Sequence, residues 1–276
     1  MVPSAARLTR RQDPVVTRCR DAARGDLSGL VLIDGVHVLL EALRADVNIE
    51  LIIATADWFE TGNNDTRQLW SLARGSGALV YEATRQVMDA VSPVKSPSGI
   101  VALANWTPSP LSSVWVTDRP LVIGLVDVQD PGNVGAVIRA ADGLGASGVV
   151  TAGATASAGG WRALRGAMGS TFRVPVAAAP LSDLLASATA AGATIWATAL
   201  DATRSATELA AADLTTPSLV LLGNEGAGLP PAALDAASHA LRVPMRPGLD
   251  SLNVTVTAAL ILYEARRQRD TERSSR

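Results

Sequence analysis

The sequence is short of the residue types that mark disulfide-stabilised, metal-binding or membrane proteins. A single cysteine, Cys19, excludes an internal disulfide framework and a cysteine-based zinc site. Neither of the two histidines, His37 and His239, has a cluster of other ligand types around it, so no metal site is expected. No charged-then-apolar leader and no run of about 18 apolar residues occurs. We therefore expect a protein without a membrane partner, working in a reducing cytoplasm.

Two common nucleotide-binding motifs are also missing from the chain. There is no Gly-x-x-x-x-Gly-Lys phosphate loop and no Gly-x-Gly-x-x-Gly fingerprint. Nucleotide hydrolysis and ordinary dinucleotide binding depend on those glycine-rich turns, which let the backbone approach phosphates closely. A nicotinamide-linked dehydrogenase is therefore disfavoured.

The chain has no large excess of positive or negative charge, because its formal net charge is only −2. No global basic field therefore indicates a nucleic acid partner. Basic character is local instead: residues 1–24 hold six arginines against two aspartates. Lys95 is the only lysine among the 24 basic residues. Alanine is overused as well, so we interpret the preference for arginine as a sign of a GC-rich coding sequence.

The chain has 276 residues, which is comfortable for two domains. Helix and strand patterns alternate up to Trp106 and predict a small α/β sandwich over residues 1–106. Residues 107–119, which contain Pro108, Pro110 and several serines, predict a linker. In the first domain the expected helices cover residues 13–24, 36–44 and 65–76, and the expected strands cover 30–33, 49–54, 78–81 and 100–104.

Residues 120–270 predict a second α/β domain with a mostly parallel sheet. Two segments, 121–139 and 219–231, each read as a buried strand, a glycine-containing turn and a helix, which is the repeating unit of such sheets. Ligands of parallel sheets bind beyond the carboxyl ends of the strands. Further strands are expected at 148–152, 174–176, 194–200 and 241–245, and further helices at 162–168, 181–191 and 251–269.

Polar residues that packing does not explain stand at three of these turns. Asn133 and Arg139 follow the first strand, Glu225 follows the strand at 219–222, and Ser251 with Asn253 opens the last helix. Ser251 is a good N-cap residue, whereas an asparagine inside a first turn is unfavourable. Other interpretations stay open: Asn133 as a helix cap, and Glu225 as a carboxylate at a helix terminus.

Arg139 also has two readings. It lies in an otherwise apolar run, where an arginine that extends to solvent or pairs with Asp142 is an alternative to a functional one.

Three ordered motifs together resemble the SpoU/TrmH family of ribose 2′-O-methyltransferases. They are Asn133-x-Gly135-x-x-x-Arg139, Gly223-Asn-Glu-Gly226, and Val243-Pro-Met245 with Ser251-Leu-Asn253. The resemblance covers roughly residues 119–269 and implies an α/β-knot (SPOUT) fold, S-adenosyl-L-methionine as methyl donor, and a homodimer. One departure is Thr255, where the family usually has a second serine, so a hydroxyl is retained.

The resemblance also implies roles for individual residues. Arg139 would hold a phosphate of the target and stabilise the developing alkoxide. Asn133 would orient Arg139 and the ribose, and Glu225 would lock Arg139 or Asn133 in place. Ser251 and Asn253 would supply hydrogen bonds near the reacting hydroxyl and the donor. Positions where the family binds adenosylmethionine are matched by Gly223, Val243 and Leu252, with Thr198 as a weaker candidate.

The first domain resembles ribosomal protein L30e, an RNA-binding fold found in relatives of this family. Asp34-Gly-Val-His37 and Lys95-Ser-Pro-Ser-Gly-Ile100 look like its recurring segments. We therefore expect a substrate-binding domain, with candidate RNA contacts at Lys95, Arg165, Arg10 and Arg11. An L30e-like domain is typical of relatives that act on 23S ribosomal RNA or confer antibiotic resistance. The resemblance therefore favours 23S ribosomal RNA as the target. Transfer RNA as target, or a non-catalytic RNA-binding protein of the same fold, are the alternatives.

The final helix is apolar nearly all round, with Leu260-Ile-Leu-Tyr263 in succession. A terminal helix of this kind needs cover on several faces. It is therefore expected to be central to its domain, to form a dimer interface, or both.

Overall fold

The computed structural model describes residues 5–60, 62, 64–198, 206–246 and 251–274. The chain forms two compact units. The N-terminal unit comprises Met1–Thr107 and Gly159–Phe172, and the C-terminal unit comprises Pro108–Ala158 and Arg173–Arg276. No helix among the described residues combines the length and apolar character needed to cross a bilayer.

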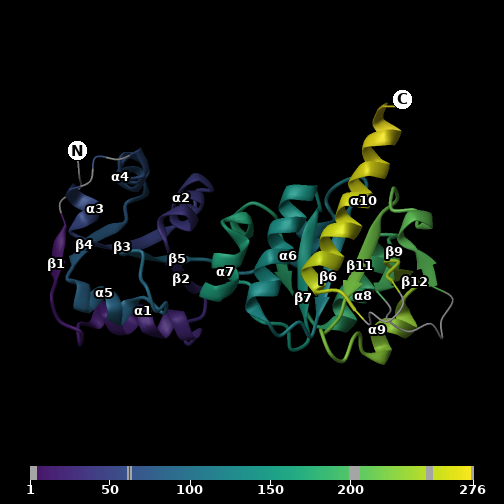
Figure 1. Cartoon of the computed structure of the whole chain (residues 1–276), viewed down its shortest axis with the longest axis horizontal. Coiled ribbons are helices and arrows are strands. Elements are labelled where there is room, and N and C mark those ends of the chain that lie inside the picture. Colours follow the sequence, from purple (N-terminus) through teal and green to yellow (C-terminus); the bar gives the residue numbers. More distant parts are fainter. Residues whose placement is uncertain (1–4, 61, 63, 199–205, 247–250, 275–276) are drawn as a thin grey trace. The chain divides into compact units, whose positions relative to one another are not determined.

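The N-terminal unit is a five-stranded sheet covered by helices on both faces (Figure 1). The strand order is β1-β4-β3-β5-β2; β1, β4 and β3 run parallel, and β5 is antiparallel to β3 and β2. The strands are β1 (Ala6–Leu8), β2 (Leu30–Asp34), β3 (Ile49–Thr55), β4 (Leu79–Ala83) and β5 (Ile100–Asn105). The helices are α1 (Pro14–Arg24), α2 (Val36–Arg44), α3 (Asp57–Glu60), α4 (Asn64–Ser76) and α5 (Arg85–Val91).

Strand alternation produces the two faces of this unit. Successive side chains of a strand point to opposite sides, so Leu30 and Leu32 pack with α1 and α5, whereas Val31 and Ile33 pack with α2 and α4. Cys19 lies buried in the first of these cores, and burial raises the pKa of its thiol to about 12. An inert core thiol is consistent with the absence of disulfide chemistry.

Two segments, residues 107–119 and residues 159–172, differ from the expectation. Residues 107–119 were expected to be a linker, yet they contain a 3₁₀ turn, η1 (Leu111–Trp115), with Val114 fully buried in the C-terminal unit. The helix α7 (Trp161–Ala167) and the 3₁₀ turn η2 (Ser170–Phe172) group with the N-terminal unit, where Leu164 joins the core. A buried face on a helix does not indicate which core it will join.

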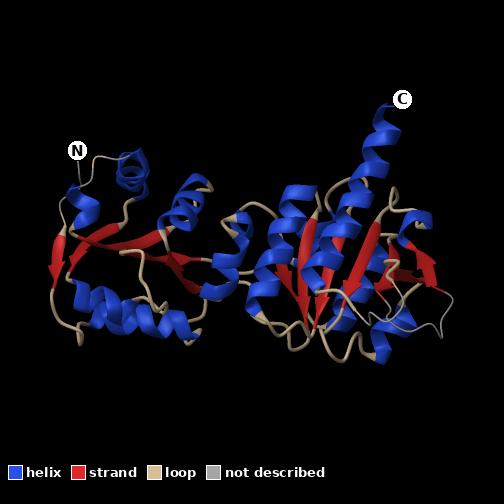
Figure 2. Cartoon of the chain, viewed as in Figure 1, coloured by secondary structure: helices blue, strands red, loops and turns tan. Residues whose placement is uncertain are grey.

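The C-terminal unit is a seven-stranded sheet in which every described pairing is parallel (Figure 2). The mostly parallel α/β fold expected from the sequence is therefore confirmed. The strand order is β10-β12-β9-β11-β6-β7-β8. The strands are β6 (Leu121–Val126), β7 (Gly148–Ala152), β8 (Val176–Ala178), β9 (Thr194–Thr198), β10 (Ala206–Glu208), β11 (Ser218–Leu222) and β12 (His239–Arg242). The expected end of the strand at 199–200 lies outside the described residues.

Helices cover both faces of this sheet. Leu184 of α8 (Leu181–Ala190) and Ala233 of α9 (Pro231–Ala236) belong to the core on one face. On the other face α6 (Pro131–Leu144) and α10 (Val254–Ser274) lie side by side (Figure 1). A further 3₁₀ turn, η3 (Leu209–Ala211), leads from β10 toward β11. Because the strands are parallel, the carboxyl ends of β6, β9, β11 and β12 meet at one edge of the sheet, where a ligand site is expected.

Candidate active site

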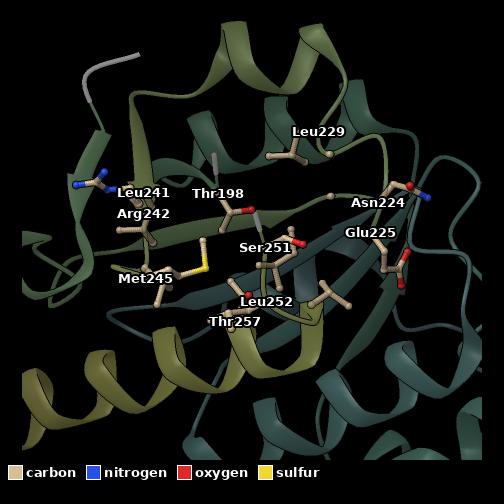
Figure 3. Close-up of a pocket in the computed structure, with 15 residues that line it drawn as sticks. Thr198, Asn224, Glu225, Leu229, Leu241, Arg242, Met245, Ser251, Leu252 and Thr257 are labelled. Atoms are coloured by element: carbon tan, nitrogen blue, oxygen red, sulfur yellow. The ribbon is translucent and has the colours of Figure 1, made fainter. Parts of the chain in front are cut away.

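A pocket opens at the carboxyl ends of β9, β11 and β12 and is closed by the start of α10 (Figure 3). Thr198, Met245 and Ser251 face one another across it, while the side chain of Arg242 points away and pairs with Glu208 at 2.7 Å. The lining is Thr198, Leu222, Gly223, Asn224, Glu225, Gly228, Leu229, Leu241, Arg242, Val243, Met245, Ser251, Leu252, Val254 and Thr257. All four residues expected at the adenosylmethionine positions, Thr198, Gly223, Val243 and Leu252, are among them.

The turn after β11 forms one wall of the pocket. Its two ends are hydrogen-bonded to each other through the backbone of Asn224 and Gly228, at 3.0 Å in both directions. A Cβ at position 223 would lie 2.4 Å from the carbonyl carbon of Gly228, so only glycine permits this approach. Gly228 itself adopts φ +71°, a left-handed conformation that also favours glycine. The sequence therefore fixes a narrow turn whose backbone faces the pocket.

Asn224 holds this turn on the sheet, a role that the sequence did not reveal. Its Oδ1 accepts hydrogen bonds from the backbone N–H groups of Gly226 and Ala227, both at 2.9 Å. Its Nδ2 donates to the backbone carbonyl of Asp127 at 2.9 Å. The only signal in the sequence was an asparagine between two turn-forming residues, which predicts local capping and not a bond across 97 positions.

Asp127, directly after β6, supplies the carbonyl that accepts this hydrogen bond from Asn224, and its own conformation is fixed by its neighbours. It is a non-glycine residue with φ +58°, and its Oδ1 accepts a hydrogen bond from the backbone N–H of Ala154 at 2.7 Å. A Cβ on Gly153 would lie 2.2 Å from the same oxygen. A left-handed aspartate is uncommon and stays in place only when its surroundings determine it. The turn after β11 is thereby joined to the ends of both β6 and β7.

Four polar side chains form a continuous hydrogen-bonded network beside the pocket. Asn133 donates from Nδ2 to Glu225 Oε1 at 2.8 Å. Its Oδ1 accepts from Asn253 Nδ2 at 3.1 Å and from Thr255 Oγ1 at 3.4 Å. The three predicted residues Asn133, Glu225 and Asn253 are therefore in direct contact, although they lie up to 120 positions apart in the sequence. Thr255, which replaces the family's usual serine, takes part through its hydroxyl.

The helix caps settle one open alternative and correct one expectation. Asp130 caps α6, because its Oδ1 accepts from the N–H groups of Gly132 at 2.6 Å and Asn133 at 3.0 Å. Asn133 is therefore not the cap, and its side chain is free for the network. The expectation that α10 opens at Ser251 was wrong, since the helix begins at Val254. Asn253 stands at the cap position instead, and its Oδ1 accepts from the N–H of Thr255 at 2.8 Å.

Ser251 therefore lies ahead of the helix, where it is exposed and lines the pocket. Thr257 and Leu241 also line the pocket but were not assigned a role from the sequence, and Met245 was noted only as part of the Val243-Pro-Met245 motif. Their apolar or weakly polar character at regular spacing is typical of any packed helix or strand.

Arg139, unlike Asn133, Glu225 and Asn253, takes no part in the hydrogen-bonded network. It is exposed on α6, and no hydrogen bond or ion pair joins it to another residue in the part of the chain that the structure describes. Its alternative partner, Asp142, is held by Arg173 at 2.7 Å. The role of Arg139 stays a prediction.

The candidate RNA contacts all lie in the N-terminal unit, whereas the network lies in the C-terminal unit. Arg10 and Lys95 are exposed, and Arg11 donates to the backbone carbonyl of Gln86 at 3.2 Å. Arg165 lies near Asp34. Burial raises the pKa of the Asp34 carboxyl above its usual value, and the Ser92 hydroxyl and Arg165 offset part of that rise. Within the described residues no group of three or more potential metal ligands occurs.

Two known protein families match the chain in order. The SpoU rRNA Methylase family matches residues 120–263, and the MRM3-like substrate binding domain matches residues 23–102. The first match spans more than half of the chain and includes all five predicted catalytic residues.

Individual relatives resemble the chain over nearly its whole length. RlmP of Bacillus subtilis (strain 168), a 23S rRNA (guanosine(2553)-2′-O)-methyltransferase, is 32% identical over 85% of this chain and 88% of its own. The AdoMet-bound rRNA methyltransferase from Sinorhizobium meliloti superimposes with a TM-score of 0.84 at 27% identity, covering 96% and 98% of the two chains. The SpoU methyltransferase AviRb from Streptomyces viridochromogenes, in complex with AdoMet, gives a TM-score of 0.82 at 25% identity over 94% and 99%.

Proposed function

Because the chain belongs to the SpoU rRNA methylase family, we propose that it transfers a methyl group from S-adenosylmethionine to a ribose 2′-hydroxyl of RNA. The observation that carries this proposal is the Glu225–Asn133–Asn253 network at the rim of the strand-end pocket. A non-catalytic RNA-binding scaffold has no need to join three polar side chains from three distant segments beside a pocket at the strand ends. RlmP and the AdoMet-bound relatives support the same reaction.

The residues of the pocket fit S-adenosylmethionine. The ligand has a flat adenine that requires close backbone approach and a neutral apolar wall. Gly223 and Gly228 supply that backbone, and Leu222, Leu229 and Leu241 supply apolar surface. When bound, S-adenosylmethionine supplies a methyl group on a positively charged sulfur, which is already activated for displacement. No metal is required for that chemistry.

The network then has two tasks, to align the ribose and to make its hydroxyl more nucleophilic. Glu225 accepts from the Asn133 amide and so fixes which way that amide faces. The Asn133 oxygen in turn fixes the Asn253 and Thr255 side chains at the start of α10. Ser251, which is exposed and lines the pocket, is assigned to hydrogen-bond the sugar. Positioning of reactants by rigid side chains accounts for a large part of the barrier reduction in such displacements.

Arg139 is assigned to the phosphate of the target nucleotide and to the developing alkoxide. Its exposure and lack of a partner within the described residues leave the guanidinium available to RNA. We do not assign it as a general base, because an arginine guanidinium stays protonated at ordinary pH and its neutral form is rare. A nearby cation instead favours the ionised hydroxyl.

The RNA target is proposed to be 23S ribosomal RNA. RlmP acts on 23S rRNA according to its name, and it aligns with both units of this chain. The match of residues 23–102 to a substrate binding domain supports RNA capture by the N-terminal unit. A protein that modifies ribosomal RNA is expected in the cytoplasm.

A homodimer is proposed from the exposed side of α10. Val256, Leu260 and Tyr263 are 47%, 40% and 61% exposed and follow the i, i+4, i+7 spacing of one helical stripe. The opposite side of α10, which includes Ala258, Ile261 and Ala265, is fully buried. A contiguous apolar stripe on a helix that is already packed on its other side is typical of a surface that covers a second copy. The knotted passage of the family stays a prediction for this chain.

The direct test is methyl transfer in vitro. Purified protein is incubated with S-adenosylmethionine carrying a tritiated methyl group and with unmodified 23S rRNA transcripts. A ribose 2′-O-methyl group makes the following phosphodiester resistant to alkaline hydrolysis, so the expected product is one labelled, alkali-resistant dinucleotide. Label found on a base, or no incorporation into RNA by a protein that binds S-adenosylmethionine, would contradict the proposal.

A further inference from the structure

A second cavity, which we name the rim pocket, lies in the N-terminal unit at the carboxyl ends of β3 and β4. It is separate from the adenosylmethionine pocket, since the two share no residue. It falls entirely within residues 23–102, the segment that matches a substrate binding domain. Its lining residues are Thr55, Asp57, Trp58, Arg85, Met88, Asp89, Ser96, Pro97, Ser98 and Gly99.

The wall formed by residues 96–99 is held in a defined shape. The Trp58 indole N–H donates to the Ser98 carbonyl at 3.3 Å, and the backbone N–H of Thr55 donates to the Gly99 carbonyl at 2.9 Å. Gly99 has φ +81°, and a Cβ there would lie 2.7 Å from Thr55 Oγ1 and 3.1 Å from Trp58 Nε1. The bonds fix the orientation of the indole, so an aromatic face is ready without reorganisation on binding.

The chemistry of the lining fits a nucleobase better than a bare phosphate. Trp58 and Pro97 provide apolar surface for a flat ring. Asp57 and Asp89 repel phosphate but accept hydrogen bonds from the ring N–H and amino groups of bases. Asp89 is exposed, and Ser96 and Ser98 add further hydrogen-bonding groups at the mouth.

Two cations stand where the sugar–phosphate of such a base would pass. The Arg85 side chain is 84% exposed, and it pairs with Asp57 at the long distance of 3.9 Å. Lys95, the only lysine of the chain, is exposed and directly precedes the lining residue Ser96. Proteins read single-stranded RNA by stacking unpaired bases on aromatic side chains, contacting the base edges and neutralising the backbone outside.

We propose that the rim pocket binds one unstacked base of the RNA substrate, stacked on Trp58, with its phosphate at Arg85 and Lys95. This inference rests on the proposed function, because it supplies the RNA contact of the substrate-binding unit. The base is one that presents N–H donors to Asp57 and Asp89. The rim pocket thus helps to select the RNA segment, whereas the C-terminal unit performs the reaction.

The test compares Trp58→Leu and Trp58→Phe with the wild-type chain in binding to 23S rRNA transcripts. Base–aromatic stacking predicts about tenfold weaker binding for Trp58→Leu and recovery to within about threefold for Trp58→Phe. Trp161→Leu, a partly buried tryptophan of the same unit that does not line the rim pocket, is the matched control and should bind normally. RNA affinity of Trp58→Leu within twofold of wild type would overturn the inference.

Two further measurements keep the test decisive if Trp58→Leu fails to fold. Arg85→Ala changes an exposed side chain and should lower the slope of log affinity against log salt by about one. Transcripts carrying 4-thiouridine, irradiated with the wild-type protein, should crosslink to peptides that contain Trp58 or residues 96–99. An unchanged salt slope together with crosslinks confined to other peptides would equally overturn the inference.

Failure of the inference and failure of the proposed function give different results. If the wild-type protein methylates RNA and Trp58→Leu binds it normally, only the rim-pocket assignment fails. If the wild-type protein methylates no RNA but Trp58→Leu still loses affinity, the rim pocket stands and the enzymatic function fails.

Discussion

At the residue scale, the site depends on amide side chains that each satisfy several partners at once. Asn133 uses both its donor and its acceptor, and Asn224 accepts two hydrogen bonds inside its own turn and donates one to Asp127, directly after β6. Aspartate has the same shape as asparagine but no N–H, so it can retain the acceptor contacts and lose only the donor. The two halves of the amide can therefore be separated by mutation.

The first prediction follows for Asn224→Asp. The variant keeps an oxygen for the N–H groups of Gly226 and Ala227 but sets a carboxylate against the carbonyl of Asp127. An unmade, repelling contact of this kind costs about 1–3 kcal/mol. We expect S-adenosylmethionine to bind about tenfold or more weakly by calorimetry, since Asn224 lines the cofactor pocket. Asn105→Asp, on an exposed side chain of β5, is the control, and equal affinities for the two variants would contradict the role of Asn224.

Arg139 gives the second prediction. The structure joins it to none of the described pocket-lining residues, so Arg139→Ala should leave the dissociation constant of S-adenosylmethionine within about threefold. Loss of a group that stabilises charge in the transition state typically lowers the rate about 100-fold or more, and that loss is expected in single-turnover methyl transfer. Arg67→Ala, an exposed arginine of α4, should methylate normally. Turnover of Arg139→Ala close to wild type would remove Arg139 from the catalytic assignment.

At the element scale, periodicity predicted most helices and strands but not the short elements or the caps. The helix at 36–44 and the strands at 121–126 and 148–152 were predicted with the same bounds as α2, β6 and β7, because long runs of one period determine them. The edge strands β1 and β10 were missed, since three residues become a strand only through a neighbour such as β4 or β12. The start of α10 was misplaced because Ser251 and Asn253 are both good caps.

The third prediction concerns α10. If its stripe of Val256, Leu260 and Tyr263 covers a second copy, Leu260→Asp buries a charge in that interface and should convert the dimer to a monomer. Sedimentation at micromolar protein measures this directly. Val116→Asp, which changes an apolar residue that is 78% exposed outside α10, should leave the assembly unchanged. A wild-type chain that sediments as a monomer would refute the dimer.

At the scale of the whole molecule, two α/β units and most residues of the candidate site could be predicted from the sequence. Which segment belongs to which unit could not be predicted. Motif residues were identifiable because each stands at a strand–turn–helix junction, and parallel strands bring those junctions to one edge. The contacts that hold the turns, such as Asn224 to Asp127, depend on strand order and cannot be read from local spacing. For the same reason the segment Gly159–Phe172 was placed with the second domain, although it packs in the N-terminal unit.

The most direct measurement of the central claim is a map of ribose methylation across total RNA from cells that lack this protein. We predict that one 2′-O-methyl group, in 23S rRNA, disappears in the deletion strain and returns when the wild-type chain is supplied. Supply of the Arg139→Ala chain should not restore it. A methylation map identical to that of the parent strain would contradict the account.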